Sequence, residues 1–183
     1  MIVINMFGGP GSGKSCSAAG LYHKMKLSGL NVELVMEYPK DLVYDGTLEI
    51  MLDRQEYIFA EQNQRIHRLR KDVDYVITDS PILLSVVYSK LSHESGAVSP
   101  WSAQTKFIEF VESVYHTYNN LNIFIGRPKL FQQEGRLHDE NESKSLDRRI
   151  VDELNGRSIP FTFIPANEST IDCIFEMVKD HEA

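Results

Sequence analysis

The strongest chemical signal in the sequence is a glycine-rich segment near the N-terminus, GGPGSGKS at residues 8–15. It fits the pattern G-x-x-x-x-G-K-[ST] and stands between an apolar segment and a helical one, which is the context that the pattern requires. Glycines let successive backbone N–H groups turn inward around phosphate oxygens, and the following helix directs its positive end to the same point. This predicts a phosphate-binding loop, with candidate contacts at Gly8, Gly9, Gly11, Ser12, Gly13, Lys14, Ser15 and Cys16.

Three side chains predict how this loop would hold a nucleoside triphosphate. Lys14 supplies a positive charge for the β and γ phosphates, and Ser15 offers a hydroxyl to Mg²⁺, an ion that takes few protein ligands. Asp79 follows the apolar segment 73–78, and in proteins with this loop such an aspartate reaches the Mg²⁺ shell directly or through water. The alternative is that Asp79 is a plain helix or turn cap before Pro81.

A second carboxylate, Glu37, follows the apolar segment 31–36. Because the carboxyl ends of parallel strands meet in one crevice, Glu37 and Asp79 are both expected to face the phosphates. One is then a metal partner, and the other, Glu37, orients or deprotonates an acceptor hydroxyl. The neighbouring Tyr38 is a candidate for binding the acceptor. The alternative for Glu37 is a mere loop charge.

The long helical segment 47–71 carries Gln55 and Gln62 inside an otherwise apolar stripe. A buried amide needs partners, so each glutamine either reads the base edge of an acceptor or is satisfied by neighbouring backbone. Arg54 beside them is a candidate for contact with a phosphate or the acceptor. The segment ends in a basic cluster that is either a solvated helix end or a polyanion site, formed by Arg65, His67, Arg68, Arg70 and Lys71.

Residues 126–143 have no clear period and are strongly charged, which predicts a mobile lid after a buried strand. Phosphoryl transfer needs cations around the equatorial oxygens, and an arginine supplied on closure provides one while water is excluded. Arg127 and Arg136 are the candidates for this role. Two other arginines are explained more simply by surface ion pairs with aspartates of the same helix: Arg148 and Arg149, with Asp147 and Asp152.

The elements that must position these residues alternate along the chain, which predicts an α/β fold with a parallel sheet. Short apolar segments, partly β-branched, predict strands at 1–7, 31–36, 73–78, 121–125 and 159–164. Longer amphipathic segments predict helices at 14–28, 47–71, 82–91, 102–118, 144–154 and 170–181. Right-handed crossovers through these helices would cover both faces of the sheet.

Length and composition predict one acidic domain spanning 1–183, because 19 Lys plus Arg and 26 Asp plus Glu give a net charge of −7. With 42% hydrophobic residues the chain has the composition of a soluble globular protein. It lacks an apolar run of about 18 residues and a leader pattern at its N-terminus, so a cytoplasmic protein with no membrane partner is expected. Its net negative charge argues against a protein whose whole surface binds nucleic acid.

Taken together, these residues resemble the P-loop kinases of the nucleoside and nucleotide kinase type over nearly the whole chain. The resemblance implies a three-layer fold with a five-stranded parallel sheet in the order 2-3-1-4-5, with ATP and Mg²⁺ as the donor. The acceptor would lie between the second strand and the long helix, with Glu37 as base and a helix glutamine reading the nucleobase. The family's acidic-Arg-Ser signature is here Asp79-Ser80-Pro81, which departs from ordinary nucleoside kinases.

A narrower resemblance rests on EYPKDLVYDG and ITDSPILLSVVYSKL, which are similar to small phage-encoded kinases, including those that phosphorylate 5-hydroxymethyluracil in DNA. A phage kinase would act in the host cytoplasm. The expected function is therefore transfer of the γ-phosphate of ATP to a hydroxyl of a nucleoside-type acceptor, either a small molecule or modified DNA. The alternative is a regulatory P-loop NTPase without an acceptor, in which Glu37 would have no task.

Overall fold

A five-stranded parallel sheet forms the centre of the structure, a computed structural model that describes residues 1–46, 54–96, 101–128 and 139–181. The strand order is β2-β3-β1-β4-β5, and every neighbouring pair is parallel, which confirms the expected fold and order. The strands are β1 (Ile2–Phe7), β2 (Val32–Val35), β3 (Tyr75–Thr78), β4 (Asn119–Ile125) and β5 (Thr162–Ile164).

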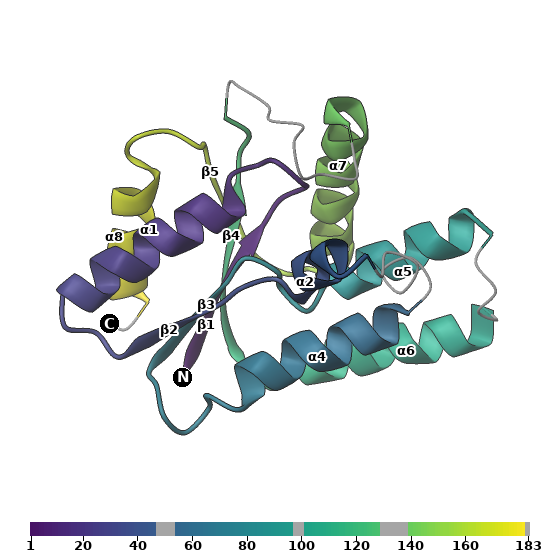
Figure 1. Cartoon of the computed structure of the whole chain (residues 1–183), viewed down its shortest axis with the longest axis horizontal. Coiled ribbons are helices and arrows are strands. Elements are labelled where there is room, and N and C mark those ends of the chain that lie inside the picture. Colours follow the sequence, from purple (N-terminus) through teal and green to yellow (C-terminus); the bar gives the residue numbers. More distant parts are fainter. Residues whose placement is uncertain (47–53, 97–100, 129–138, 182–183) are drawn as a thin grey trace.

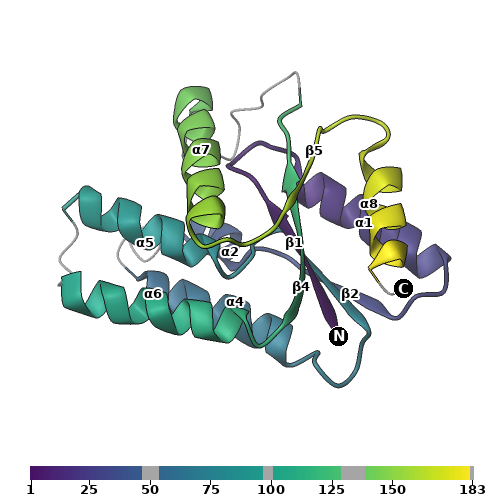
Figure 2. The same cartoon turned by 180° about the vertical axis from the view of Figure 1, so that it is seen from behind.

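Helices cover the sheet on both faces, as Figures 1 and 2 show. One face is covered by α1 (Lys14–Leu27) and α8 (Thr170–Asp180), which pack against each other. The opposite face carries four helices: α4 (Gln55–His67), α5 (Leu84–Glu94), α6 (Trp101–Tyr115) and α7 (Glu140–Gly156). A short helix, α2 (Tyr38–Tyr44), follows β2 and packs on α4.

No helix in the described part of the chain is both long and apolar enough to cross a membrane.

The central strand β1 separates two apolar clusters, because successive side chains of a strand point to opposite faces. Ile4 and Met6 are buried against α1 and α8, whereas Val3 and Phe7 are buried on the face of the four helices. Apolar side chains are therefore packed on both faces of β1, so the carboxyl end of this strand, where the glycine-rich loop begins, is fixed from both sides.

A buried polar network lies between β1 and β4 on the face of the four helices, within the apolar cluster that contains Val3 and Phe7. The Asn5 amide donates to Asn122 Oδ1 at 3.0 Å, and the Tyr115 hydroxyl donates to the same oxygen at 2.8 Å. The Asn122 amide in turn donates to the backbone carbonyl of Pro160 at 3.0 Å. Buried amides are tolerated when their partners are present, and here the bonds of Asn122 to Asn5 and Pro160 join segments that are distant in the sequence.

Several element bounds differ from the sequence-based expectation by a few residues, and three of the differences affect segments near the site. Helix α2 was not expected; its Pro39 stands in the first turn, where a proline costs no hydrogen bond. The predicted helix 47–71 is described from Gln55, and residues 47–53 lie outside the described residues. The predicted start of α7 at 144 was wrong. This helix begins at Glu140 because Asp139 and Glu142 form a reciprocal capping box.

Residues 139–143 at the end of the predicted lid are therefore the cap and first turn of α7. Residues 129–138, including Arg136, lie outside the described residues.

Tyr115→Phe tests the buried network. The substitution removes one donor to Asn122, and we expect the free energy of unfolding to fall by about 1 kcal/mol. Chemical denaturation of both proteins measures this difference. Tyr44→Phe is the matched control, because Tyr44 is 79% exposed and its loss of a hydroxyl should leave stability unchanged. Equal stability of the two variants would show that the network contributes nothing.

Candidate active site

The predicted site residues gather at the carboxyl edge of the sheet. The loop 8–15 follows β1, and Glu37, Asp79 and Arg127 come directly or closely after β2, β3 and β4. Because β1 is flanked by β3 and β4, the loop emerges between the strands that carry Asp79 and Arg127. The structure therefore brings the nucleotide-side candidates together around one loop.

The loop depends on backbone angles that glycine adopts readily. Gly8, Gly11 and Gly13 have φ of 139°, 80° and 96°, in the region that other residues adopt only with strain. Gly13 is the N-cap of α1, so the N-terminus of this helix opens into the loop. The Lys14 ammonium donates to the carbonyl of Gly9 at 3.0 Å and thereby spans the loop. Such a loop presents N–H groups and one ammonium to an anion.

Ser15 and Asp79 form a pair at the base of the loop. The Ser15 hydroxyl donates to Asp79 Oδ2 at 2.6 Å, and this contact favours a site role for Asp79 over a plain turn cap. The Asp79 side chain is fully buried, and its Oδ1 has no hydrogen-bond partner among the described residues. A buried carboxylate with an unused oxygen needs a cation or a donor, so this hydroxyl–carboxylate pair fits a site for Mg²⁺.

Lys14 lies inside a ring of charges. Burial lowers the pKa of Lys14 from its ordinary value of 10.5, while the negative charges of Glu37, Asp79 and Asp147 act in the opposite direction. Glu37 is therefore close enough to Lys14 to act on it electrostatically. Three carboxylates and the guanidinium of Arg127 therefore lie within electrostatic range of the Lys14 ammonium.

Arg127 contacts the loop together with a residue that sequence reasoning missed, Asp147 of α7. The Arg127 Nε donates to the Asp147 carboxylate, and its Nη1 donates to the carbonyl of Pro10 at 2.9 Å. Asp147 Oδ1 also accepts the N–H of Gly9 at 2.6 Å. Asp147 was expected to pair with an arginine of its own helix; its partner is instead Arg127, because its side chain faces the loop.

The two arginines of α7 behave differently from the surface pairs expected for them. Arg149 pairs with Glu94 of α5 at 2.8 Å, and Arg148 is exposed. Asp152, the other expected partner, is exposed on the same helix. The helix therefore uses Arg149 to reach a neighbouring helix.

On the acceptor side, Gln62 joins α4 to the ends of two strands. Its Oε1 accepts the N–H of Tyr38 at 3.0 Å, and its amide donates to Thr78 Oγ1 at 3.2 Å. These bonds favour the alternative in which the amide is satisfied within the protein. Gln55 is buried in the first turn of α4, and Arg54 is the exposed N-cap of this helix.

Tyr38 belongs to an aromatic group at the same edge that includes Tyr57, which sequence reasoning missed. The Tyr38 hydroxyl donates to the Tyr57 hydroxyl at 2.9 Å, and the rings meet edge to face with centroids 5.6 Å apart. This hydrogen bond is the main reason that the pKa of Tyr38 is raised to about 12. The Arg65 guanidinium lies 4.8 Å from the Tyr38 ring centroid and pairs with Asp41 at 2.8 Å.

The basic cluster at the end of α4 is thus partly engaged within the protein. Besides the contacts of Arg65, Arg70 donates to the carbonyl of Thr117 at 3.0 Å. Arg68 and Lys71 are exposed. These contacts favour a helix end over a dedicated polyanion surface.

Tyr88 of α5 was also missed from the sequence. Burial raises the pKa of its phenol, and the negative charges of Glu37 and Asp147 raise it further. The phenol therefore lies within electrostatic range of both carboxylates and stays protonated. Tyr88 lies within α5, and its local sequence does not indicate that it is near Glu37 and Asp147. Only the packing of α5 against α4 and α7 places it there.

Comparisons with known proteins agree with this geometry. Residues 3–170 match the family described as AAA domain. No curated protein sequence matches the chain.

Solved structures with the same fold include deoxyadenosine kinase from M. mycoides. Its form with bound dATP is 18% identical, with a TM-score of 0.65, over 97% of this chain and 99% of that one. Its form with bound dCTP is 16% identical, with a TM-score of 0.64 over the same shares. NadR protein in complex with NR is 14% identical, with a TM-score of 0.70, over 98% of this chain and 50% of that one. At these identities the likeness shows a nucleoside kinase-type P-loop fold.

Asp79→Asn tests the proposed metal side of the loop. The amide cannot replace the charge of the buried carboxylate, and we expect the gain in ATP affinity on adding Mg²⁺ to fall by about tenfold or more. Calorimetric titration of ATP with Mg²⁺ and with a chelator measures this gain. Asp74→Asn, at an exposed position directly before β3, is the matched control and should behave as the unaltered chain. A full Mg²⁺ dependence in Asp79→Asn would remove Asp79 from the metal site.

Proposed function

The chain belongs to the AAA domain family, and we propose that it is an ATP-dependent kinase that transfers the γ-phosphate to a hydroxyl of a nucleoside-type acceptor. The observation that carries this proposal is the Ser15–Asp79 pair at the base of a loop spanned by Lys14, with Glu37 in electrostatic range of that lysine. A hydrolase that only switches between states needs the loop and the pair. In such a hydrolase a second carboxylate would activate water, whereas the kinase-type fold favours an acceptor hydroxyl as the partner of Glu37.

The donor side would be formed by the loop. Its backbone N–H groups and Lys14 bind the β and γ phosphates of ATP, and the hydroxyl of Ser15 and the carboxylate of Asp79 hold Mg²⁺. Mg²⁺ bound there would neutralise charge on the phosphate oxygens as ADP leaves. Glycines 8, 9, 11 and 13, with Ser12 and Cys16, contribute through their backbone.

The acceptor side would be formed around Glu37. Its carboxylate orients the acceptor hydroxyl and takes its proton while the acceptor oxygen bonds to the γ phosphorus and the bond to the β,γ-bridging oxygen breaks. Arg127, and Arg136 in the part of the predicted lid that lies outside the described residues, would stabilise charge on the transferred group. Most of the acceleration then comes from positioning and charge neutralisation, because this transition state needs little covalent help.

The acceptor is proposed to be nucleoside-like because the kinases of similar fold bind dATP, dCTP and dCMP. Tyr38, Arg54 and Gln55 follow Glu37 or stand at the start of α4, and they would contact the acceptor. Gln62, whose amide is satisfied by Tyr38 and Thr78, would instead hold Tyr38 in place. Free nucleosides and nucleotides are one acceptor class, and the hydroxymethyl group of 5-hydroxymethyluracil in DNA is the other. The engaged state of Arg65 and Arg70 favours the small acceptor.

Transfer of labelled γ-phosphate from ATP with Mg²⁺ tests the proposal. The acceptors are nucleosides, nucleoside monophosphates, plain DNA and DNA with hydroxymethylated pyrimidines, and Lys14→Ala is the inactive control. Label in any one acceptor, absent with Lys14→Ala, supports a kinase and identifies its acceptor class. Labelled free phosphate with every acceptor unlabelled would replace the proposal with a regulatory NTPase.

Glu37→Gln separates the acceptor side from the donor side. The glutamine keeps the shape but cannot take a proton, so we expect kcat for transfer to fall by about 100-fold or more, with ATP affinity within about twofold of the unaltered chain. Transfer rates and ATP titration measure the two effects. Glu33→Gln on β2 is the control for loss of a nearby acidic charge and should retain both. An unchanged kcat in Glu37→Gln would exclude Glu37 as the base.

A further inference from the structure

Asp147 is the residue through which α7 contacts the phosphate-binding loop. Its two carboxylate oxygens have different partners: Oδ1 accepts the N–H of Gly9 at 2.6 Å, and Oδ2 accepts the Nε–H of Arg127. One side chain therefore fixes the start of the loop and the arginine that follows β4. Both of its bonds are charge-assisted and partly buried, which makes them stronger than neutral bonds at the surface.

The approach of α7 to the loop requires the absence of a side chain at position 9. A Cβ built on Gly9 would lie 2.6 Å from the carbonyl oxygen of Ser143 and 2.8 Å from both Asp147 Oδ1 and Arg127 Nη2. No side chain fits at such distances. Gly9 thus serves a contact with α7 as well as the turn of the loop.

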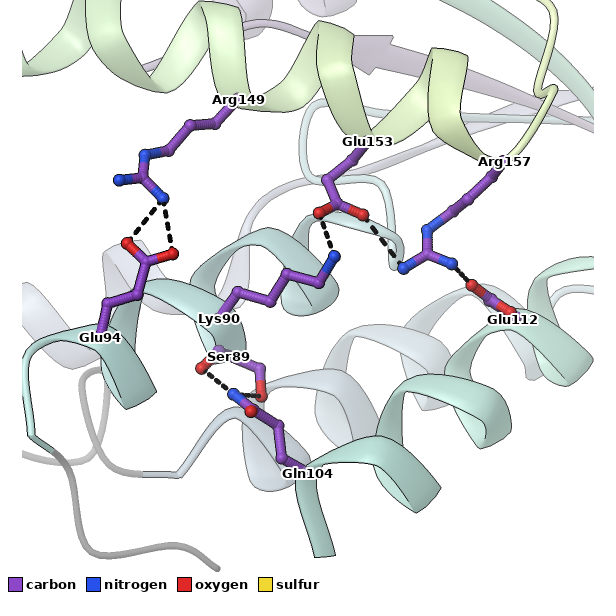
Figure 3. Close-up of polar contacts among 8 residues, drawn as sticks. All are labelled: Ser89, Lys90, Glu94, Gln104, Glu112, Arg149, Glu153 and Arg157. Atoms are coloured by element: carbon purple, nitrogen blue, oxygen red, sulfur yellow. Dashed lines mark hydrogen bonds and ion pairs between the residues drawn. The ribbon is translucent and has the colours of Figure 1, made fainter. Parts of the chain in front are cut away.

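Helix α7 is itself held against its neighbours by charged side chains, which Figure 3 shows reaching across the helix interfaces. Arg149 pairs with Glu94 of α5 at 2.8 Å. Further along the helix, Glu153 lies between Lys90 of α5 and Arg157, and the latter also reaches Glu112 of α6. These pairs fix the helix along the side that faces α5 and α6, so Asp147 projects from a supported element.

These contacts orient Arg127 but leave one of its nitrogens without a hydrogen-bond partner among the described residues. Nε is held by Asp147 and Nη1 by the carbonyl of Pro10, whereas the buried Nη2 has no partner among the described residues. This free donor lies beside Gly9, at the start of the loop. Without Asp147, the guanidinium would keep only the Pro10 contact and could turn away from the loop.

We propose that Asp147 is a positioning residue for the donor: it holds Arg127 and the start of the loop in register so that the arginine meets the terminal phosphate. This inference rests on the proposed function only for the identity of the donor, ATP. The opposite role is that Asp147 occupies the arginine in place of the phosphate and inhibits binding. The two roles change ATP affinity in opposite directions when the charge of Asp147 is removed.

Asp147→Asn distinguishes them by titration of ATP and Mg²⁺ in a calorimeter. An asparagine can still accept from Gly9, but its amide would face Arg127 with a donor. We expect ATP to bind about tenfold more weakly. Asp152→Asn, an exposed aspartate of the same helix, should bind ATP within about twofold of the unaltered chain. Unchanged or tighter binding in Asp147→Asn overturns the proposal.

A double-mutant cycle with Arg127→Met separates positioning from general damage to the fold. If Asp147 acts largely through Arg127, Asp147→Asn should weaken ATP binding far less in the Arg127→Met background. An equal loss in both backgrounds overturns the proposal. If Asp147→Asn unfolds, Asp147→Glu takes its place in the same cycle, because the longer carboxylate shifts the contact without removing the charge.

The test remains separate from that of the kinase itself. Absence of transfer to every acceptor would refute the proposed function, while the effect of Asp147→Asn on ATP titration would stand on its own. For an active kinase, the same variant should raise KM for ATP, with KM for the acceptor unchanged.

Discussion

The structure depends on one constraint: a backbone turn rich in left-handed glycine angles must be held rigid at the end of β1. Neither the glycines nor the turn can supply that rigidity, because glycine loses the most conformational freedom on folding. The loop is instead fixed from outside. Ser15 is bonded to Asp79 after β3, and Gly9 is bonded to Asp147 of α7. The sheet and α7 are therefore both parts of the site.

The same contacts arrange the charges. Lys14 is buried, which disfavours its ammonium form, and the carboxylates of Glu37, Asp79 and Asp147 oppose that effect. An anionic donor would bind where Lys14 and Arg127 already contact the loop and where nearby carboxylates partly neutralise their charges. Arg127 is held close to the loop by Asp147 and Pro10, whereas the sequence predicted an arginine that reaches the site only when a lid closes. This arrangement also gives α7 a task beyond covering the sheet.

The sequence was enough to predict the parallel sheet, the loop and the two carboxylates after β2 and β3, because each has a local pattern that follows from strand ends and glycine spacing. Asp147, Tyr57 and Tyr88 were missed because their importance arises from helix packing across long sequence separations. Gln62 shows the same limit: its place in an apolar stripe predicted a buried amide. Only the fold shows that Tyr38 and Thr78 already satisfy it.

A crystal structure with a non-hydrolysable ATP analogue and Mg²⁺ would test the central claim most directly. The account predicts the β and γ phosphates within the loop 8–15 and the metal between Ser15, Asp79 and the phosphates. It also predicts that Arg127 contacts the terminal phosphate while Asp147 still holds its Nε. A nucleotide bound away from the loop, or an Arg127 that must leave Asp147 to reach the phosphate, would contradict it.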